Sequence, residues 1–272
     1  MARKAKSSRK RQGAQATPSQ AEQLMALTVI LTANKDYEGA VTASTSLLSY
    51  LPQRSSRRID ALVALGNAQA MLKHFPEAFE AFSEALDLAP FDADLWFNRG
   101  QAGYFTMRFG RAYKDFSRAL ELNKDAQFTK QIEKSLKRSR KWMEKALRKR
   151  GQDFTLDQLI EQEDHYQRGL KLLQAQRWSE AEEAFKASIA MSDCLTQPWG
   201  NLGSCLMMQK RFDEAEEAWK HALMIDRWYR LAKRNLKLLP EIRENGLSRY
   251  LAMRDPMNKR SIEESITVIE EK

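Results

Sequence analysis

The side chains with the greatest capacity for chemistry are few and widely separated in this chain. None of its three histidines, His74, His165 and His221, lies within four residues of another. No HExxH, CxxC, GxSxG or phosphate-loop pattern occurs in the sequence. A catalytic or metal centre needs several such side chains brought together. The sequence therefore predicts no enzymatic activity, no metal site and no cofactor.

The acidic clusters and the cysteines have simpler interpretations. Adjacent acidic residues such as Glu182 and Glu183 are expected on the solvent side of helices. Cys194 and Cys205 are expected to be reduced and to pack as small apolar residues. We therefore predict a reducing compartment and a cytoplasmic location. No apolar run approaches the roughly 18 residues that a membrane span needs.

A regular spacing of small residues organises the chain. Gly66 and Gly100 are 34 residues apart, and so are Gly169 and Gly203. A fixed period of this length is typical of helical repeat arrays, in which each helix hairpin needs its neighbours to cover its apolar face.

The residues at these spacings resemble the tetratricopeptide repeat family, whose unit is a 34-residue helix-turn-helix. The family pattern has a large residue at position 4, Leu-Gly at 7 and 8, Ala at 20, an aromatic at 24, Ala at 27 and Pro at 32. Residues 59–92 supply Leu62, Leu65, Gly66, Ala78, Phe82, Ala85 and Pro90. The resemblance implies an all-α fold, an α-α superhelix (solenoid) of helix hairpins.

The pattern divides the chain into two repeat blocks. Block one, residues 21–126, contains three predicted hairpins, and block two, residues 162–229, contains two. The hairpins are predicted at residues 21–54, 59–92, 93–126, 162–195 and 196–229.

The interval 127–161 is predicted to be a basic linker helix followed by a helix extension. No turn signal interrupts residues 127–150, and Gly151 is a natural helix stop. Thr155 and Gln158 have the spacing of a capping box, which would start the next helix early.

The chain is expected to close with a capping helix at residues 230–247, which Pro240 should kink or end. The remaining segments are a basic N-terminal tail at 1–20, predicted to be disordered, and a charged tail at 248–272.

The formal net charge of +9 is concentrated in three segments. Residues 1–11 carry six basic side chains and no acidic ones. Residues 127–150 and 227–260 each carry ten basic side chains and at most three acidic ones. The repeat bodies are consequently acidic. Basic segments of this kind could contact nucleic acid or an acidic surface, or could simply be solvated.

In the family that the chain resembles, the first helices of the hairpins line a concave groove that binds partners. The resemblance therefore implies a partner-binding set in that groove, in which amides would bind a peptide backbone and aromatic or Met side chains would form apolar pockets. The set is Asn67, Phe97, Asn98, Gln101, Tyr104, Phe105, Tyr166, Gln167, Asn201, Ser204 and Met207.

One variant of this groove, which holds chaperone C-terminal carboxylates, is not predicted. Val63 stands where that variant has its first Lys, and no matching Lys and Arg pair follows the third hairpin.

Two functional hypotheses follow. The first is a non-enzymatic scaffold that binds a peptide or protein partner in the groove. The alternative is a nucleic-acid- or ribosome-associated adaptor that binds through the basic tail and linker helix. Steep salt dependence of binding would favour the alternative, because neutralised phosphates release counterions.

Overall fold

The computed structural model describes residues 19–247, and every regular element within that range is an α-helix. The all-helical fold predicted from the repeat period is therefore confirmed. Apart from residues 19 and 20, which cap and begin the first helix, the two predicted tails lie outside the described range.

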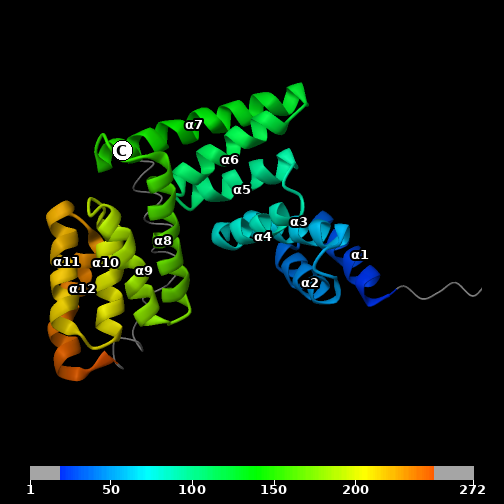
Figure 1. Cartoon of the computed structure of the whole chain (residues 1–272). Coiled ribbons are helices and arrows are strands. Elements are labelled where there is room, and N and C mark those ends of the chain that lie inside the picture. The colour runs from blue at the N-terminus through cyan, green and yellow to red at the C-terminus, as the bar shows by residue number, and fades with distance from the viewer. Residues whose placement is uncertain (1–18, 248–272) are drawn as a thin grey trace, which may run out of the picture. The chain divides into compact units, whose positions relative to one another are not determined.

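The chain divides into two compact units, one up to Pro90 and one from Phe91 onward. The first unit contains the helices coloured blue to cyan in Figure 1: α1 (Gln20–Ala33), α2 (Tyr37–Tyr50), α3 (Ser56–Met71) and α4 (Phe75–Leu88). The second unit contains α5 (Ala93–Phe105), α6 (Phe109–Leu122), α7 (Ala126–Arg150), α8 (Leu156–Gln174), α9 (Trp178–Met191), α10 (Thr196–Met208), α11 (Phe212–Ile225) and α12 (Arg230–Asn245).

Five helix pairs form hairpins in the described part of the chain, and three of them begin before the predicted ranges, with α1 at Gln20, α3 at Ser56 and α8 at Leu156. They are α1 with α2, α3 with α4, α5 with α6, α8 with α9, and α10 with α11. Helices α7 and α12 stand alone, and each packs on the second helix of the hairpin before it. They therefore occupy the place that the first helix of a further repeat would take.

All five hairpins turn through the same backbone geometry. The second residue after each first helix ends has a left-handed φ of 58 to 62°, and none of these residues is glycine. The next N–H bonds back to the carbonyl five residues earlier, which completes a Schellman motif. The left-handed residues are Lys35, Lys73, Met107, Gln176 and Lys210.

Four hairpins share one contact at their centre, between a glycine of the first helix and an aromatic ring of the second. A Cβ added to the glycine would approach the ring to between 2.4 and 2.8 Å, so only glycine fits. The pairs are Gly66 with Phe82, Gly100 with Phe116, Gly169 with Phe185 and Gly203 with Trp219. The aromatic at position 24 thus fills the interior of its own hairpin.

The first hairpin replaces both members of this contact. Thr28 occupies the glycine position and Ser44 the aromatic position, and both are buried. The Thr28 hydroxyl donates to the carbonyl of Leu24 at 2.9 Å. The Ser44 hydroxyl is buried without a hydrogen-bond partner among the described residues. A larger residue on one helix is therefore matched by a smaller one on the other.

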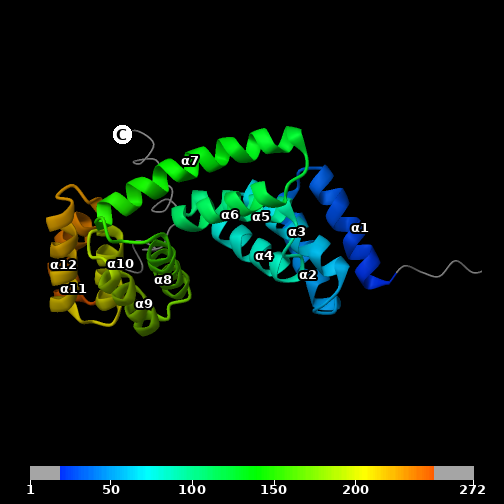
Figure 2. The ribbon, with the colours of Figure 1, turned by 45° about the horizontal axis from the view of Figure 1, so that its top comes forward.

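The long helix α7 lies along α6 in both Figure 1 and Figure 2. Its Ile132 is completely buried in a cluster with Phe97 and Phe116, while Leu136 and Leu147 are half-buried. The stop at Gly151, which has a φ of 113°, matches the prediction. The capping box of Thr155 and Gln158 is also present and starts α8 two turns early.

Helix α12 packs on α11 of the last hairpin, and Pro240 does not end it. The helix continues through Pro240 to Asn245 and ends at Gly246, which has a φ of 78°. Leu239 and Ile242, on either side of the proline, are buried in the core of the second block. This packing offsets the hydrogen bond that the proline cannot donate.

Candidate functional site

The candidate site is the surface formed by the first helices of the hairpins, which we call the first-helix face. In the second unit it comprises α5 and α8 with α10, extended by the single helices α7 and α12. The structure divides the predicted partner-binding residues into buried side chains and side chains that reach this surface.

Three of the predicted residues are buried and are corrected here. Phe97 is 5% exposed, with its ring centroid 5.0 Å from that of Phe128 and 5.5 Å from that of Phe116. Met207 is completely buried. Gln167 is 8% exposed and donates from Nε2 to the carbonyl of Thr106 at 2.7 Å. Their side chains hold helices together, so a ligand on the first-helix face would not reach them.

The remaining predicted residues on α5 are half-buried and lie next to the basic helix α7. The guanidinium of Arg138 lies over the Tyr104 ring, 4.2 Å from its centroid, and donates to Gln101 Oε1 at 3.5 Å. Asn98 and Phe105 belong to the same helix and are also half-buried. Arg138 of the linker helix α7 therefore adds a cation to this part of the first-helix face, where all the predicted residues belong to α5.

An aromatic series continues from this cation along α7. The ring centroid of Phe109, on α6, is 5.8 Å from that of Tyr104. The Phe109 ring also stacks on Trp142 of α7, with ring centroids 5.5 Å apart and an angle of 17° between the ring planes. The ammonium of Lys145 lies 4.9 Å from the Trp142 ring centroid. Aromatic faces attract cations through their quadrupoles, so the series is held between two positive charges.

The second block presents a smaller polar group. Asn201 Nδ2 donates to the Tyr166 hydroxyl at 3.2 Å, which joins α10 to α8. Desolvation raises the pKa of Tyr166 above its usual range, so the phenol stays neutral. The Ser204 hydroxyl donates to the carbonyl of Gly200 within its own helix. Asn201 and Tyr166 are thus the central pair of this part of the face.

Asn67 belongs to the first unit and is considered separately. It lies on α3 and its side chain is exposed. It neighbours the buried Gly66, which packs against Phe82. Its amide therefore faces outward from a well-packed hairpin.

Sequence reasoning did not identify Glu163, whose buried carboxyl group joins the two repeat blocks. Glu163 accepts hydrogen bonds from the backbone N–H of Gly110, at 3.1 Å, and of Arg111, at 3.4 Å, in the first turn of α6. Burial nevertheless raises its pKa to about 8. Asp164 beside it pairs with Arg108 and Arg111. No sequence signal could have found Glu163, because its partners are backbone groups more than fifty residues away.

Positive charge is concentrated on the two single helices. Helix α7 carries ten basic residues against Glu133 and Glu144, and its last turn is Arg148, Lys149 and Arg150. Helix α12 carries five basic residues against Glu241 and Glu244. Helix α7 packs on α6 and also contacts α5 and α8, whereas α12 packs on α11.

Two further observations concern alternative kinds of site. Within residues 19–247, no group of three or more His, Cys, Asp and Glu side chains is placed to hold a metal ion. No helix in that range is long and apolar enough to cross a membrane. Cys205 is buried, which raises the pKa of its thiol to about 12, and both cysteines are free.

Comparisons with known proteins address the fold. The profile of the tetratricopeptide repeat family matches residues 63–127 and 197–227. No curated protein sequence matches the chain.

Solved structures that match include three proteins with tetratricopeptide repeats. The P58(IPK) TPR domain is 15% identical, with 83% of this chain and 66% of that chain covered and a TM-score of 0.45. A tetratricopeptide repeat protein from Parabacteroides merdae is 17% identical, with coverages of 83% and 86% and a TM-score of 0.40. The yeast Sti1 TPR2AB domain, solved as a complex with pHSP90, is 14% identical, with coverages of 89% and 91% and a TM-score of 0.38.

The hairpin geometry, the glycine and aromatic contacts at the 34-residue period and the two profile matches agree with one another. This chain contains tetratricopeptide repeats, at residues 63–127 and 197–227.

Proposed function

We propose that this protein is a non-enzymatic scaffold that binds an extended, acidic segment of a partner protein across the first-helix face of its second unit. The observation that carries the proposal is the position of Arg138, which adds a cation to the amide and phenol groups of Gln101 and Tyr104. Carboxylates of a partner would pair with such a cation, and its backbone would bond to the amides.

The basic helices on either side support the same choice of partner. A segment with carboxylates at intervals would meet α7 at one part of the face and α12 at the other. Asn201 with its Tyr166 partner would supply the polar contact between them. Asn98 and Ser204 would act similarly within the second unit.

A pair of charge-matched variants tests the proposal. Partners would first be selected from a display library of extended peptides with the full-length chain. Arg138→Gln should weaken binding of a selected peptide about tenfold, since a charge-assisted hydrogen bond contributes on the order of 1.5–3 kcal/mol. Lys149→Gln removes the same charge from an exposed position on the same helix and should have little effect. Equal losses for both variants would contradict a specific site.

The amides are tested separately. Asn98→Ala combined with Asn201→Ala should weaken binding of the same peptide while helicity is preserved. Asn245→Ala, at the end of α12, is the control for loss of an exposed amide. Unchanged affinity of the double variant would refute the first-helix face as the binding surface.

Salt dependence, compared between the two charge variants, separates the protein-binding function from the nucleic-acid alternative. An acidic peptide that pairs carboxylates with a few cations should also lose affinity as salt rises, but its affinity should depend on Arg138 much more than on Lys149. Binding to single-stranded or double-stranded nucleic acid that falls steeply with salt, and equally for Arg138→Gln and Lys149→Gln, would favour the adaptor function instead.

A further inference from the structure

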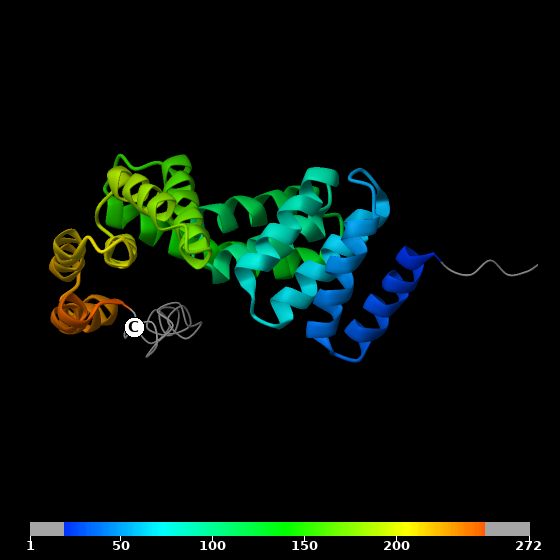
Figure 3. The same ribbon diagram turned by 90° about the horizontal axis from the view of Figure 1, so that it is seen from below.

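Helix α1 exposes large apolar side chains on the side that faces away from its hairpin. Ile30 is 55% exposed, Val29 61% and Leu27 44%, while Ala26 and Ala33 beside them are also exposed. Figure 3 shows α1 at one end of the first unit. The terminal helix of a repeat array normally has a polar outer face, because no further repeat covers it.

On its inner face, α1 packs against its own hairpin through other side chains, so the exposed apolar residues are not needed for that packing. Ala21, Leu24 and Met25 pack on a cluster that contains Leu47 and Leu51 of the second helix and its end. The one fully buried residue of α1 is polar, Thr28. Helix α1 is therefore apolar on both sides, which is typical of a helix that is covered on both sides.

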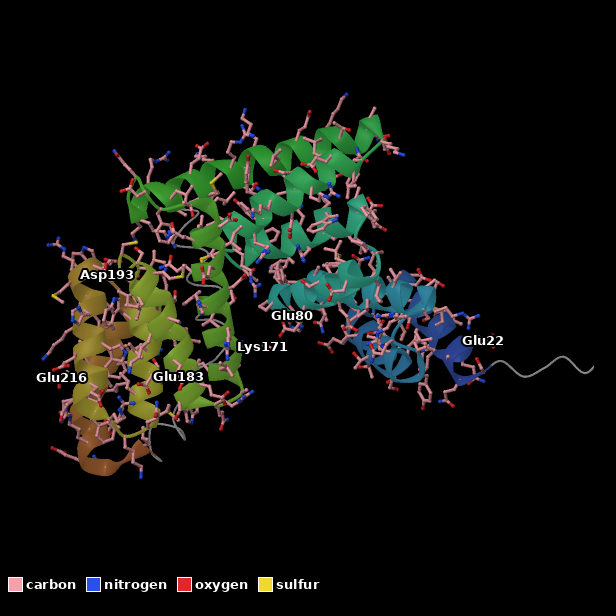
Figure 4. The ribbon with its side chains drawn as sticks, viewed as in Figure 1. Glu22, Glu80, Lys171, Glu183, Asp193 and Glu216 are labelled. Carbon is pink, nitrogen blue, oxygen red and sulfur yellow. The ribbon has the colours of Figure 1, made fainter. Side chains whose placement is uncertain are left out.

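We propose that the outer face of α1 binds α1 of a second copy of this protein, with the two helices antiparallel about a two-fold axis. A second copy is chosen as the partner because charged residues of opposite sign lie at the two ends of the outer face of α1. Glu22 lies in the first turn, where Figure 4 labels it, and Lys35 follows the last turn; both are exposed. These are the charges that flank the apolar residues.

An antiparallel pair centred between Thr28 and Val29 brings these charges together. Residues 22 and 35 are equally far from that centre, at about 10 Å for a rise of 1.5 Å per residue. Glu22 of each copy would therefore lie level with Lys35 of the other, and Leu27 level with Ile30. A parallel pair would instead place Glu22 beside Glu22 and Lys35 beside Lys35.

The basic segment that precedes α1 favours the same orientation. Residues 1–11 carry six basic side chains and no acidic ones, and they are joined to the N-terminal end of α1. In a parallel pair, two such segments would start side by side. In an antiparallel pair they would start about 25 Å apart, well beyond the screening length of about 8 Å at physiological ionic strength.

The first test is the oligomeric state of the full-length chain, measured by sedimentation equilibrium. Wild type should be a dimer at micromolar concentrations, and Ile30→Glu should raise the dimer dissociation constant at least tenfold. Met224→Glu is the matched control, since Met224 is a large apolar residue, 70% exposed, on α11. A wild-type chain that stays monomeric at concentrations on the order of 100 μM would overturn the proposal.

The second test addresses the orientation through charge exchange between copies. Glu22→Lys alone and Lys35→Glu alone should each weaken the dimer, because each homodimer then contains two like-charged pairs. An equimolar mixture of the two variants should recover wild-type affinity, since both pairs of the heterodimer again have opposite charges.

The mixture also controls for damage to the fold. Glu22 belongs to the capping box of α1 and lies 3.9 Å from Arg57, so its replacement could affect the helix itself. Mixing with a second variant would not repair such damage. A mixture as weakly associated as the separate variants would therefore overturn the antiparallel arrangement.

Discussion

Gly203 lies directly beneath the indole of Trp219, so that a Cβ on the glycine would be 2.4 Å from the indole nitrogen. That nitrogen donates to the carbonyl of Gly200 at 3.0 Å, and Trp219 is completely buried. The ring cannot move away without losing this hydrogen bond. The glycine is therefore required by the contact between the two helices of the hairpin.

This contact predicts a change in stability opposite to the one that helix propensity predicts. Gly203→Ala should lower the free energy of unfolding by about 1–3 kcal/mol, although alanine in a helix interior is normally better than glycine by about 1 kcal/mol. Chemical denaturation would measure the change. In combination with Trp219→Leu, the alanine should cost much less than it does alone, because the smaller side chain leaves room for it. Full additivity would show that the clash is not the cause.

A second prediction concerns the hydroxyl of Ser44, which is buried without a partner. Ser44→Ala should raise the free energy of unfolding by about 1 kcal/mol, because it removes an unsatisfied polar group and leaves almost the same volume. Ser46→Ala, at an exposed position of the same helix, is the control and should have a small effect. A lower melting temperature for Ser44→Ala would indicate that the hydroxyl has a partner in solution.

A third prediction uses the left-handed turns. Lys210 is exposed and has a φ of 62°, which strains a residue with a side chain. Lys210→Gly should raise the free energy of unfolding by about 1 kcal/mol. The same change at Lys237, exposed within α12, should lower it by a similar amount, since glycine is a poor helix former. Thermal unfolding of both variants would check the contrast, and equal losses would contradict it.

A fourth prediction follows from the pKa of Glu163, which burial raises from its ordinary value of 4.5 to about 8 in the folded protein. The folded state therefore holds this proton more tightly than the unfolded state does. The stabilisation is fully present below about pH 4.5 and is lost progressively as the pH rises to about 8.

The Glu163 prediction is checked by comparing variants across that pH range. The stability of wild type relative to Glu163→Gln should decline between pH 4.5 and pH 8 and then level off. Glu183→Gln, on the exposed side of α9, serves as the control and should show no comparable decline. A flat difference for Glu163→Gln would mean that the carboxylate is not buried between α6 and α8.

The sequence by itself determined the local structure of this protein. The helix hairpins, the unbroken α7, its stop at Gly151 and the cap at Thr155 all depend on residues close together in the chain. Short-range chemistry decides such features, since a cap or a helix stop involves only neighbouring backbone groups. The repeat period located the glycines and the aromatic residues, but their contact within each hairpin is known only from the structure.

Only the tertiary structure decided which of the predicted binding residues reach the surface. Phe97 and Met207 stand at face positions in the repeat, but α7 covers Phe97 and the second block encloses Met207. The position of Arg138 over Tyr104 and the bonds from Gly110 to Glu163 likewise join residues 34 and 53 positions apart. Such contacts depend on how helices pack, and a helical pattern specifies which face is apolar without specifying which helix covers it.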